Sequence, residues 1–369
     1  MYFFYFGSHH QLSAWELGTL IDPAHWQEGK NGVFVANRHV PALDWQAQLA
    51  CLGGIREVIL LPEAPSANWT EAVSSFDLEW LGTNKEVTLL APSCSEEART
   101  TMLSELKRHI FEQSKLKIRF RVNKTYLVEE DGLVLWWMAD NNNQMYLGRA
   151  IAQQTVQAYS ERDYDKPARS MQRGMLPPKL AQIMINGAKV SAETLIWDPF
   201  CGTGTVVVEA ALMGHRVCGS DVDAKAIVET EKNSKALVSL EKQNLIEDIW
   251  QQDCTRAWLK EPEAPCVIVA EGYLGPPLSK ALARGEELQH FWQRVEPTYQ
   301  QFFLRLRDSA IKKMVLVTPV TVLADGTSRL AKRSWDILSQ AGWVTTFTAD
   351  YIRAGQFVGR QITMMEKLT

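Results

Sequence analysis

Residues 195–205 read Leu-Ile-Trp-Asp-Pro-Phe-Cys-Gly-Thr-Gly-Thr. An apolar run ends at Asp198, a glycine-rich turn follows, and the stretch from Val206 to Met213 has a helical pattern. A strand, a tight loop and a helix in this order form the entry to the ligand site of a doubly wound α/β sheet. Gly202 and Gly204 lack a Cβ, so the backbone can turn sharply and approach a ligand closely. The segment therefore predicts a nucleotide-type site in a Rossmann-like domain.

The same loop distinguishes between two classes of cofactor. A dinucleotide-binding fingerprint needs a third glycine three residues after the second, and this chain has Val207 there. An acid, Asp198, stands just before the loop, and a carboxylate suits a cationic or amine-bearing ligand better than a diphosphate. S-adenosylmethionine (SAM) carries an α-amino group and a sulfonium, so we expect SAM rather than NAD. The loop residues expected to bind it are Asp198, Pro199, Phe200, Cys201, Gly202, Thr203 and Gly204.

Three further acids follow predicted strands. Asp221 ends the run Arg216–Asp221, about 20 residues after Asp198, where a carboxylate can accept hydrogen bonds from ribose hydroxyls, with Val222 against the adenine. Asp253, next to Cys254, is expected to accept the exocyclic amine of adenine. Glu271 ends the apolar run that begins at Cys266. Because ligands of open α/β sheets bind at the carboxyl ends of strands, these acids predict one shared site.

Length and composition agree with a multidomain soluble protein. A chain of 369 residues predicts two or three domains, and 46% hydrophobic with 22% charged residues is ordinary for a globular protein. The net charge of −4 leaves nucleic-acid contacts to local patches. The six cysteines form no CxxC pair, so we expect reduced thiols and no metal site. No apolar run approaches a membrane span or a signal peptide, and we expect a cytoplasmic protein.

Hydrophobic periodicity divides the chain. Residues 1–60 and 61–160 each read as α/β units, in which Glu96–Gln113 is an expected helix and Lys115–Val122 and Leu133–Met138 are expected strands. Residues 161–175 are charged and lack apolar periodicity, which indicates a linker. Residues 176–369 alternate helix and strand, which predicts a mainly parallel sheet. The expected fold class is α/β, with a C-terminal Rossmann-like methyltransferase domain.

With these residues in view, the chain resembles the THUMP-containing tRNA guanine-N2 methyltransferases, the family of the guanosine-10 enzymes. The resemblance covers about residues 145–369 and rests on the loop Asp198–Thr203 and on several other segments. These are Tyr146-Leu-Gly-Arg149, Gln157-Ala-Tyr-Ser160, Arg162-Asp-Tyr164 with Lys166-Pro167, Gly174 to Gln182 with Asn186, and Val358-Gly-Arg-Gln-Ile362. It implies SAM-dependent N2-methylation of a guanosine in tRNA. For the N-terminal α+β half it implies a ferredoxin-like part over 1–60 and a THUMP-like RNA-binding domain over 61–160.

The chain departs from this family at the expected catalytic strand end. The family pattern is Asp-Pro-Pro-Tyr, and this chain has Glu271-Gly272-Tyr273. An exocyclic amine is a poor nucleophile, so enzymes hold it with a carboxylate or amide and a backbone carbonyl while an aromatic ring stacks on the base. We expect Glu271 and the Gly272 carbonyl to receive the amine and Tyr273 to stack. Methylation of adenine or of DNA, and a non-catalytic protein that binds SAM or RNA, remain the alternatives.

Two basic segments are candidates for RNA contact. Lys115, Lys117, Arg119 and Arg121 alternate with apolar residues, so as one strand they share a face that can hold phosphates. A solvated sheet face without RNA is the alternative. Lys166, Arg169 and Arg173 form a second basic cluster in the expected linker, close to the proposed site.

Overall fold

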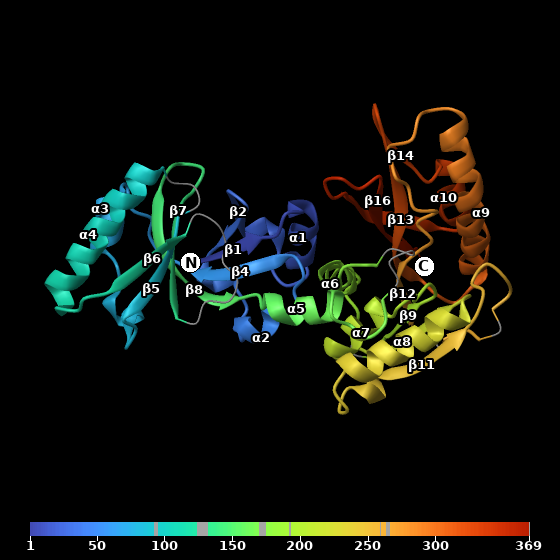
Figure 1. The fold of residues 1–369 in the computed structure, drawn as a ribbon, viewed down its shortest axis with the longest axis horizontal. Helices are drawn as coiled ribbons and strands as arrows, with labels where there is room; N and C mark the ends of the chain where they lie inside the picture. Colours follow the sequence, from blue (N-terminus) through green and yellow to red (C-terminus); the bar gives the residue numbers. More distant parts are fainter. Residues whose placement is uncertain are drawn as a thin grey trace. The chain divides into compact units, whose positions relative to one another are not determined.

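The computed structural model describes residues 1–91, 95–123, 132–169, 175–191, 193–258, 260–262 and 266–368. The chain divides into two compact units, Met1–Ala158 and Tyr159–Thr369. In Figure 1 the first unit runs from blue to green and the second from green to red. The helix α5 (Val156–Asp163) contains the division. The described part of the expected linker, residues 161–169, therefore belongs to the second unit.

The first unit is built on one mixed eight-stranded sheet in the order β2-β3-β1-β4-β8-β7-β5-β6. Strand β4 pairs with β8 in the middle, so the sheet runs through both of the expected units, 1–60 and 61–160. The strands are β1 (Tyr2–Phe6), β2 (Trp26–Gly29), β3 (Gly32–Val35), β4 (Ile55–Leu60), β5 (Glu86–Leu90), β6 (Arg119–Asn123), β7 (Leu133–Ala139) and β8 (Met145–Gln153). The helices are α1 (His10–Leu17), α2 (Trp45–Leu49), α3 (Trp69–Ser74) and α4 (Glu96–Ser114).

Alternation along the strands of the first unit produces two buried faces. Leu133, Leu135 and Trp137 of β7 pack in a core with α3 and α4. Val134 and Trp136 point the other way, into a second cluster with residues of β1. Successive side chains of a strand point to opposite faces of its sheet, so a strand that is covered on both faces is apolar along its whole length. The predicted helix at 96–113 and the strand at 133–138 are confirmed, because α4 and β7 occupy these positions.

The predicted strand at Lys115–Val122 is wrong in its first half. Helix α4 continues to Ser114, and Lys115 ends it in the left-handed conformation with φ of 60°. Strand β6 begins only at Arg119. Leu116 is 45% exposed and so does not belong to an apolar strand face. A polar–apolar alternation across a helix end imitates the period of a strand.

The second unit has the predicted Rossmann-like organisation. Its sheet order is β11-β10-β9-β12-β13-β16-β15, with the hairpin strand β14 beside β13. The neighbouring strands β11, β10, β9, β12 and β13 are parallel to one another. Strand β16 lies between β13 and β15 and is antiparallel to both. The strands are β9 (Leu195–Asp198), β10 (Val217–Asp221), β11 (Ile246–Gln251), β12 (Cys266–Glu271), β13 (Lys313–Leu323), β14 (Gly326–Arg329), β15 (Trp343–Tyr351) and β16 (Val358–Lys367). The helices are α6 (Pro178–Gly187), α7 (Thr205–Leu212), α8 (Ala224–Leu237), α9 (Glu286–Asp308) and α10 (Lys332–Ser339).

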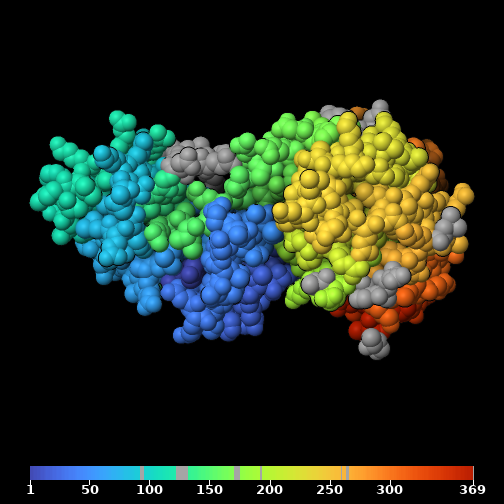
Figure 2. Space-filling view, turned by 90° about the horizontal axis from the view of Figure 1, so that it is seen from below, coloured from blue at the N-terminus to red at the C-terminus, as the bar shows by residue number. Residues whose placement is uncertain are grey.

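Helices cover both faces of this sheet. Ile268 and Ala270 of β12 face a large core that contains residues of α9 and α10, the two helices drawn orange to red beside the sheet in Figure 1. Val267 and Val269 alternate with them and are buried on the opposite face, where α6 and α7 pack on each other and on β13 and β9. In Figure 2 the yellow segment around α8 and β11 forms much of the visible surface of the second unit. The predicted fold class is confirmed for this unit.

Glu57 in β4 gives a prediction about the stability of the first unit. Its side chain is 5% exposed and accepts a hydrogen bond from the indole of Trp136. Burial raises the pKa of Glu57 from 4.5 to about 7. A carboxyl whose pKa is higher in the folded state stabilises the fold at low pH and loses this contribution as pH rises from about 4.5 through 7. We expect Glu57→Gln to remove this decline. The unfolding free energy of the variant minus that of the wild type should therefore rise by about 2–3 kcal/mol from pH 5 to pH 8.

Urea denaturation at both pH values measures this gain. Glu79→Gln, at an exposed position of the same unit, is the control and should follow the wild type. An equal pH dependence in Glu57→Gln and wild type would show that Glu57 does not carry the effect.

Candidate functional site

The candidate site lies where the order of the parallel strands reverses. Strands β9 and β12 are neighbours, and the chain leaves β9 toward β10 on one side and β12 toward β13 on the other. The helices that follow diverge at such a point and leave a crevice at the carboxyl ends of the strands. Asp198 and Glu271 are the last residues of these two strands. The topology therefore places the two predicted acids at one crevice.

The glycine loop between β9 and α7 has the conformation that its glycines allow. Gly202 and Gly204 adopt φ of 55° and 81°, in the left-handed region that favours glycine. A Cβ on Gly204 would lie 2.7 Å from Cγ2 of Thr230, so α8 approaches the loop directly. The hydroxyl of Thr230 donates to the carbonyl of Gly202 at 3.0 Å. Glycine at 204 is thus required by both backbone conformation and space.

Asp198 is a buried carboxylate beside a small cavity. It is 2% exposed and accepts the N–H of Phe200 at 3.0 Å. Burial raises the pKa of Asp198 well above its usual range, and the charges of Asp221 and Glu271 raise it further. The cavity, about 50 Å³, is lined by Met175, Leu176, Asp198, Phe200, Cys201, Gly202, Thr203, Thr205, Val206 and Glu271. A cationic group in it would relieve the repulsion among these carboxylates.

Asp221 connects the second strand to the glycine loop. One carboxylate oxygen accepts the N–H of Gly202 and the other that of Asp223, both at 2.9 Å. Val222, the residue predicted to lie against the adenine, is 61% exposed. Asp221 therefore holds the loop and lies at the carboxyl end of β10, where the ribose acceptor is predicted.

Asp253 follows β11 in a tightly braced turn. Its carboxylate accepts the N–H and the hydroxyl of Thr255 at 3.0 and 2.6 Å, and it forms an ion pair with Arg256 at 3.1 Å. Cys254 beside it is buried. These local contacts fix the acid near the crevice but also occupy part of its acceptor capacity.

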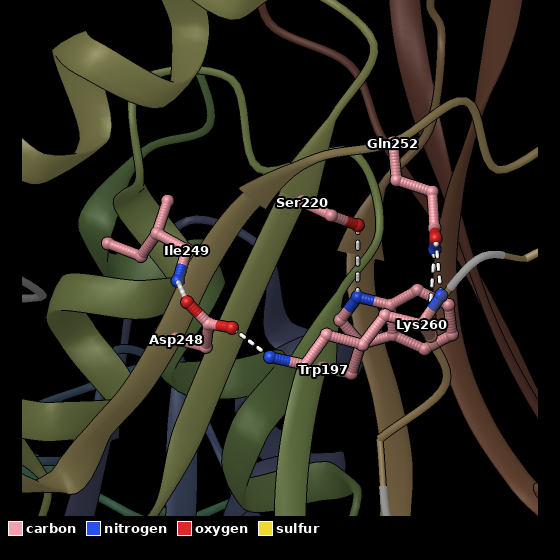
Figure 3. Close-up of polar contacts among 6 residues, drawn as sticks. All are labelled: Trp197, Ser220, Asp248, Ile249, Gln252 and Lys260. Atoms are coloured by element: carbon pink, nitrogen blue, oxygen red, sulfur yellow. Dashed lines mark hydrogen bonds and ion pairs between the residues drawn. The ribbon is translucent and has the colours of Figure 1, made fainter.

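The loop that carries Asp253 is closed at its far end by Lys260. Figure 3 shows the Gln252 side chain bonded to the backbone of Lys260, at 3.1 Å to the carbonyl and 3.0 Å to the N–H. The ammonium of Lys260 pairs with Asp248 on β11. The indole of Trp197 donates to the hydroxyl of Ser220 at 3.1 Å, which ties β9 to β10 beneath the loop. The turn at which the adenine contact is predicted is thus held by hydrogen bonds at both of its ends.

Lys166 belongs to the wall of the site rather than to its surface. It is 5% exposed, and its ammonium lies 3.3 Å from the hydroxyls of both Thr203 and Thr205. Burial lowers the pKa of Lys166, while neighbouring acids that include Asp163 and Glu271 oppose this change. A side chain buried in this way cannot neutralise a phosphate at the surface. The prediction that Lys166 contacts RNA is therefore wrong.

Asn233 of α8 fastens the same segment to the glycine loop. Its side-chain amide accepts the N–H of Ala168 at 2.8 Å and donates to the carbonyls of Ala168 and Thr203 at 3.0 and 2.8 Å. Asn233 is fully buried. The segment expected to be a linker is therefore part of the candidate site. Sequence reasoning missed Asn233, although an asparagine inside a helix is an unusual choice that can indicate such a bond.

A buried polar network holds α5 against α6 and α7. Glu209 of α7 is 1% exposed. Its carboxylate accepts hydrogen bonds from Arg162 at 2.7 Å and from Gln182 at 2.8 Å. The hydroxyl of Tyr159 donates to Gln182 at 2.7 Å. This network explains the segments around Tyr159, Arg162 and Gln182 that carry the family resemblance. Glu209 was missed, although an acid within the run Val206–Ala211 is a recognisable signal.

At the end of β12, Glu271 is held by an arginine from β16. Arg360 Nε lies 2.5 Å from Glu271 Oε1, and the two side chains are 5% and 14% exposed. Arg360 also donates to the carbonyl of Met175 at 3.1 Å. Sequence reasoning quoted Arg360 only within the segment Val358–Ile362 and gave it no role at the site, because 89 residues separate it from Glu271. Tyr273, the predicted stacking residue, is 39% exposed.

The four basic residues of the first unit that are predicted to contact RNA, Lys115, Lys117, Arg119 and Arg121, are exposed but differ in structure. Arg119 and Arg121 lie on β6, and Arg121 pairs with Glu86 at 2.6 Å. Lys117 borders a hollow of about 310 Å³ together with Lys107, Phe111, Leu116 and Ile118. Arg169, in the second unit, is exposed and lies 5.7 Å from the ring of Tyr164. Arg173 lies outside the described residues.

The described residues hold free thiols, but no cluster of metal ligands and no membrane-spanning helix. Cys51, Cys201, Cys218, Cys254 and Cys266 are free thiols, and Cys94 lies outside the described residues. Burial raises the pKa of the Cys201 thiol. Within the described ranges no three His, Cys, Asp or Glu side chains cluster in a way that could hold a metal ion. No helix there is long and apolar enough to cross a membrane.

Comparisons with known proteins agree with this geometry. Residues 166–265 match the family described as "RMKL-like, methyltransferase domain". The tRNA (guanine(10)-N2)-dimethyltransferase of Methanothermobacter thermautotrophicus is 48% identical over 60 residues, which are 16% of this chain and 18% of the relative. The tRNA (guanine(10)-N(2))-methyltransferase TRMT11 of Rattus norvegicus is 32% identical over 104 residues, 27% of this chain and 22% of the relative. The matches thus span about a fifth of these relatives.

Similarity of fold extends over the whole chain. The crystal structure of TrmN from Thermus thermophilus aligns with 100% of this chain and 100% of its own, with a TM-score of 0.59 and 15% identity. At this identity the alignment shows the fold alone. The resemblance drawn from the sequence motifs is confirmed as a similarity: residues 166–265 match an RMKL-like methyltransferase domain, and short segments of the chain are similar to tRNA guanine-N2 methyltransferases.

Proposed function

We propose that this protein is a SAM-dependent RNA methyltransferase that methylates N2 of a guanosine in tRNA. The observation that carries the proposal is the single crevice at which Asp198, the glycine loop and Glu271 meet. The matched relatives are named as guanosine-10 N2-methyltransferases. A tRNA substrate implies the cytoplasm as the place of action.

The donor set of the crevice suits SAM. Asp198 and Glu271 supply negative charge beside the cavity, which would repel a diphosphate and attract a sulfonium or an ammonium group, and Asp221 would accept the ribose hydroxyls. Val222 and the fixed turn of Asp253 and Cys254 would contact the adenine, and the loop from Pro199 to Gly204 would surround the methionine part. When bound, SAM supplies an activated methyl group on a sulfonium.

The residues at the end of β12 would receive the acceptor base. Glu271, oriented by Arg360, and the Gly272 carbonyl would accept the hydrogens of the exocyclic amine and aim its lone pair at the methyl group. Tyr273, partly exposed beside them, would stack on the base. Such alignment lowers the barrier because a delocalised amine gains reactivity mainly through orientation. The proton lost by the amine would pass to solvent or to Glu271.

We assign RNA binding to exposed basic residues of both units. The first unit would act as a THUMP-like RNA-binding domain through Lys115, Lys117, Arg119 and Arg121, and Arg169 with Tyr164 would add a contact in the second unit. Arg173 belongs to this proposal from its sequence position.

The central test is a methylation assay with labelled SAM and bulk tRNA, followed by digestion to nucleosides. We expect label in N2-methylguanosine. Glu271→Gln should reduce turnover about a hundredfold or more while SAM still binds, because it weakens the acceptor for the amine.

Each other outcome of this assay contradicts a defined part of the proposal. Label in a methylated adenosine, or transfer to DNA only, would replace the guanine assignment by the adenine or DNA alternative. Folded protein that binds SAM but transfers no methyl group would support a non-catalytic protein instead.

Asp221 yields a prediction about cofactor affinity. Asp221→Asn removes a charged acceptor at the ribose position and weakens the bond to the Gly202 N–H, so SAM affinity should fall about ten- to a hundredfold. Isothermal titration calorimetry measures this change. Asp325→Asn, an exposed acid paired with Arg284, is the matched control and should bind SAM normally. Unchanged affinity in Asp221→Asn would refute the ribose assignment.

The burial of Lys166 separates cofactor binding from RNA binding. Lys166→Met should weaken SAM binding several-fold, because Thr203 and Thr205 lose their ammonium partner, and should leave tRNA affinity unchanged. Arg121→Ala and Arg169→Ala should do the reverse, and each should lower the slope of log affinity against log salt by about 1. Filter binding at several salt concentrations tests this. A salt-dependent loss of tRNA binding in Lys166→Met would contradict the structural assignment.

A further inference from the structure

The loop after β12 is packed directly on helix α9. Phe291, Val295 and Tyr299 are buried and spaced four residues apart, so they form one ridge along this helix. A Cβ on Gly272 would lie 2.6 Å from the hydroxyl oxygen of Tyr299. A Cβ on Gly275 would lie 2.7 Å from the ring of Phe291 and 2.9 Å from Val295. The ridge therefore leaves no room for a side chain at either glycine.

Two hydrogen bonds fix the same loop. The N–H of Gly272 donates to the carbonyl of Val317 at 3.0 Å, which continues the pairing of β12 with β13. The hydroxyl of Tyr299, a fully buried residue, donates to the carbonyl of Tyr273 at 2.9 Å. These bonds hold the backbone at the N–H of Gly272 and at the carbonyl of Tyr273. Gly272 and Tyr273 are the two residues that follow Glu271.

A proline at position 272 would be incompatible with this arrangement. Proline has no N–H for the bond to Val317, and its Cβ would enter the space that the Tyr299 hydroxyl occupies. Glycine at position 272 therefore fits the tyrosine on α9. A hydrogen bond from this tyrosine restrains a loop that has no pyrrolidine ring at position 272.

We propose that Tyr299 is a positioning residue for the acceptor base: through the Tyr273 carbonyl it holds the Glu271-Gly272-Tyr273 segment in the orientation needed for transfer. Tyr299 is fully buried, so it would act on a bound base only through this loop. The inference rests on the proposed function, because the segment is the proposed amine acceptor.

The first test compares Tyr299→Phe with wild type by two measurements. Hydrogen exchange followed by mass spectrometry, without RNA, should show faster exchange in the peptide that covers residues 271–276. The kcat for tRNA methylation should fall about two- to tenfold, as for loss of one hydrogen bond, with the KM for SAM unchanged. Tyr146→Phe is the control, because its hydroxyl bonds the side chain of Asp140 in the first unit and makes no contact with the loop after β12. It should change neither measurement.

A second variant tests the exclusion of proline. Gly272→Pro restores the residue of the family pattern, and we expect it to reduce kcat at least about tenfold because the Val317 bond is lost and Tyr299 is displaced. Thermal melting and SAM binding verify that both variants fold. Higher turnover in Gly272→Pro than in wild type would overturn the proposal.

The measurements separate this inference from the proposed function. Unchanged exchange over residues 271–276 in Tyr299→Phe overturns the tether, whatever the activity. Faster exchange with an unchanged kcat overturns the positioning role. A wild-type protein that folds and binds SAM but methylates no RNA contradicts the proposed function, and exchange alone then decides whether Tyr299 holds the loop.

Discussion

The ion pair between Glu271 and Arg360 is the interaction on which the candidate site depends. It joins the end of β12 to β16, and the bond from Arg360 to the Met175 carbonyl adds the segment before α6. Both side chains are largely buried, and removal of one partner of such a pair costs about 3–5 kcal/mol because an unpaired charge remains. The pair therefore links three separate parts of the chain, and the carboxylate that faces the cavity is oriented by it.

Charge balance around the cavity extends this dependence to the segment before α6. Asp198 and Glu271 are the largely buried acids at the cavity, and Arg360 and Lys166 are the buried basic residues near them. Lys166 reaches the loop because Asn233 fastens Ala168 to Thr203. The physical requirement is that buried charges be compensated, and distant residues meet it.

Prediction from the sequence succeeded where the signal is local. The run from Leu195 to Thr205 identified strand, loop and helix because glycine conformation and apolar periodicity act over a few residues. It failed at Lys115, where a helix end continued an alternating pattern. It also failed at Lys166, whose partners Thr203 and Thr205 are 37 and 39 residues away. Burial of a charge depends on such distant partners, and composition and spacing do not contain them.

The end of β12 shows how a departure from a family pattern can be read physically. From the sequence, Gly272 in place of proline signifies a loss of rigidity. In the structure, glycine is the residue that allows the loop to touch α9, because any Cβ would meet Tyr299. The substitution and the helix residue therefore form one unit, although 27 residues separate them along the chain. A motif that departs from its family at one position should thus be judged together with the side chains packed on it, since these determine which backbone is held and how firmly.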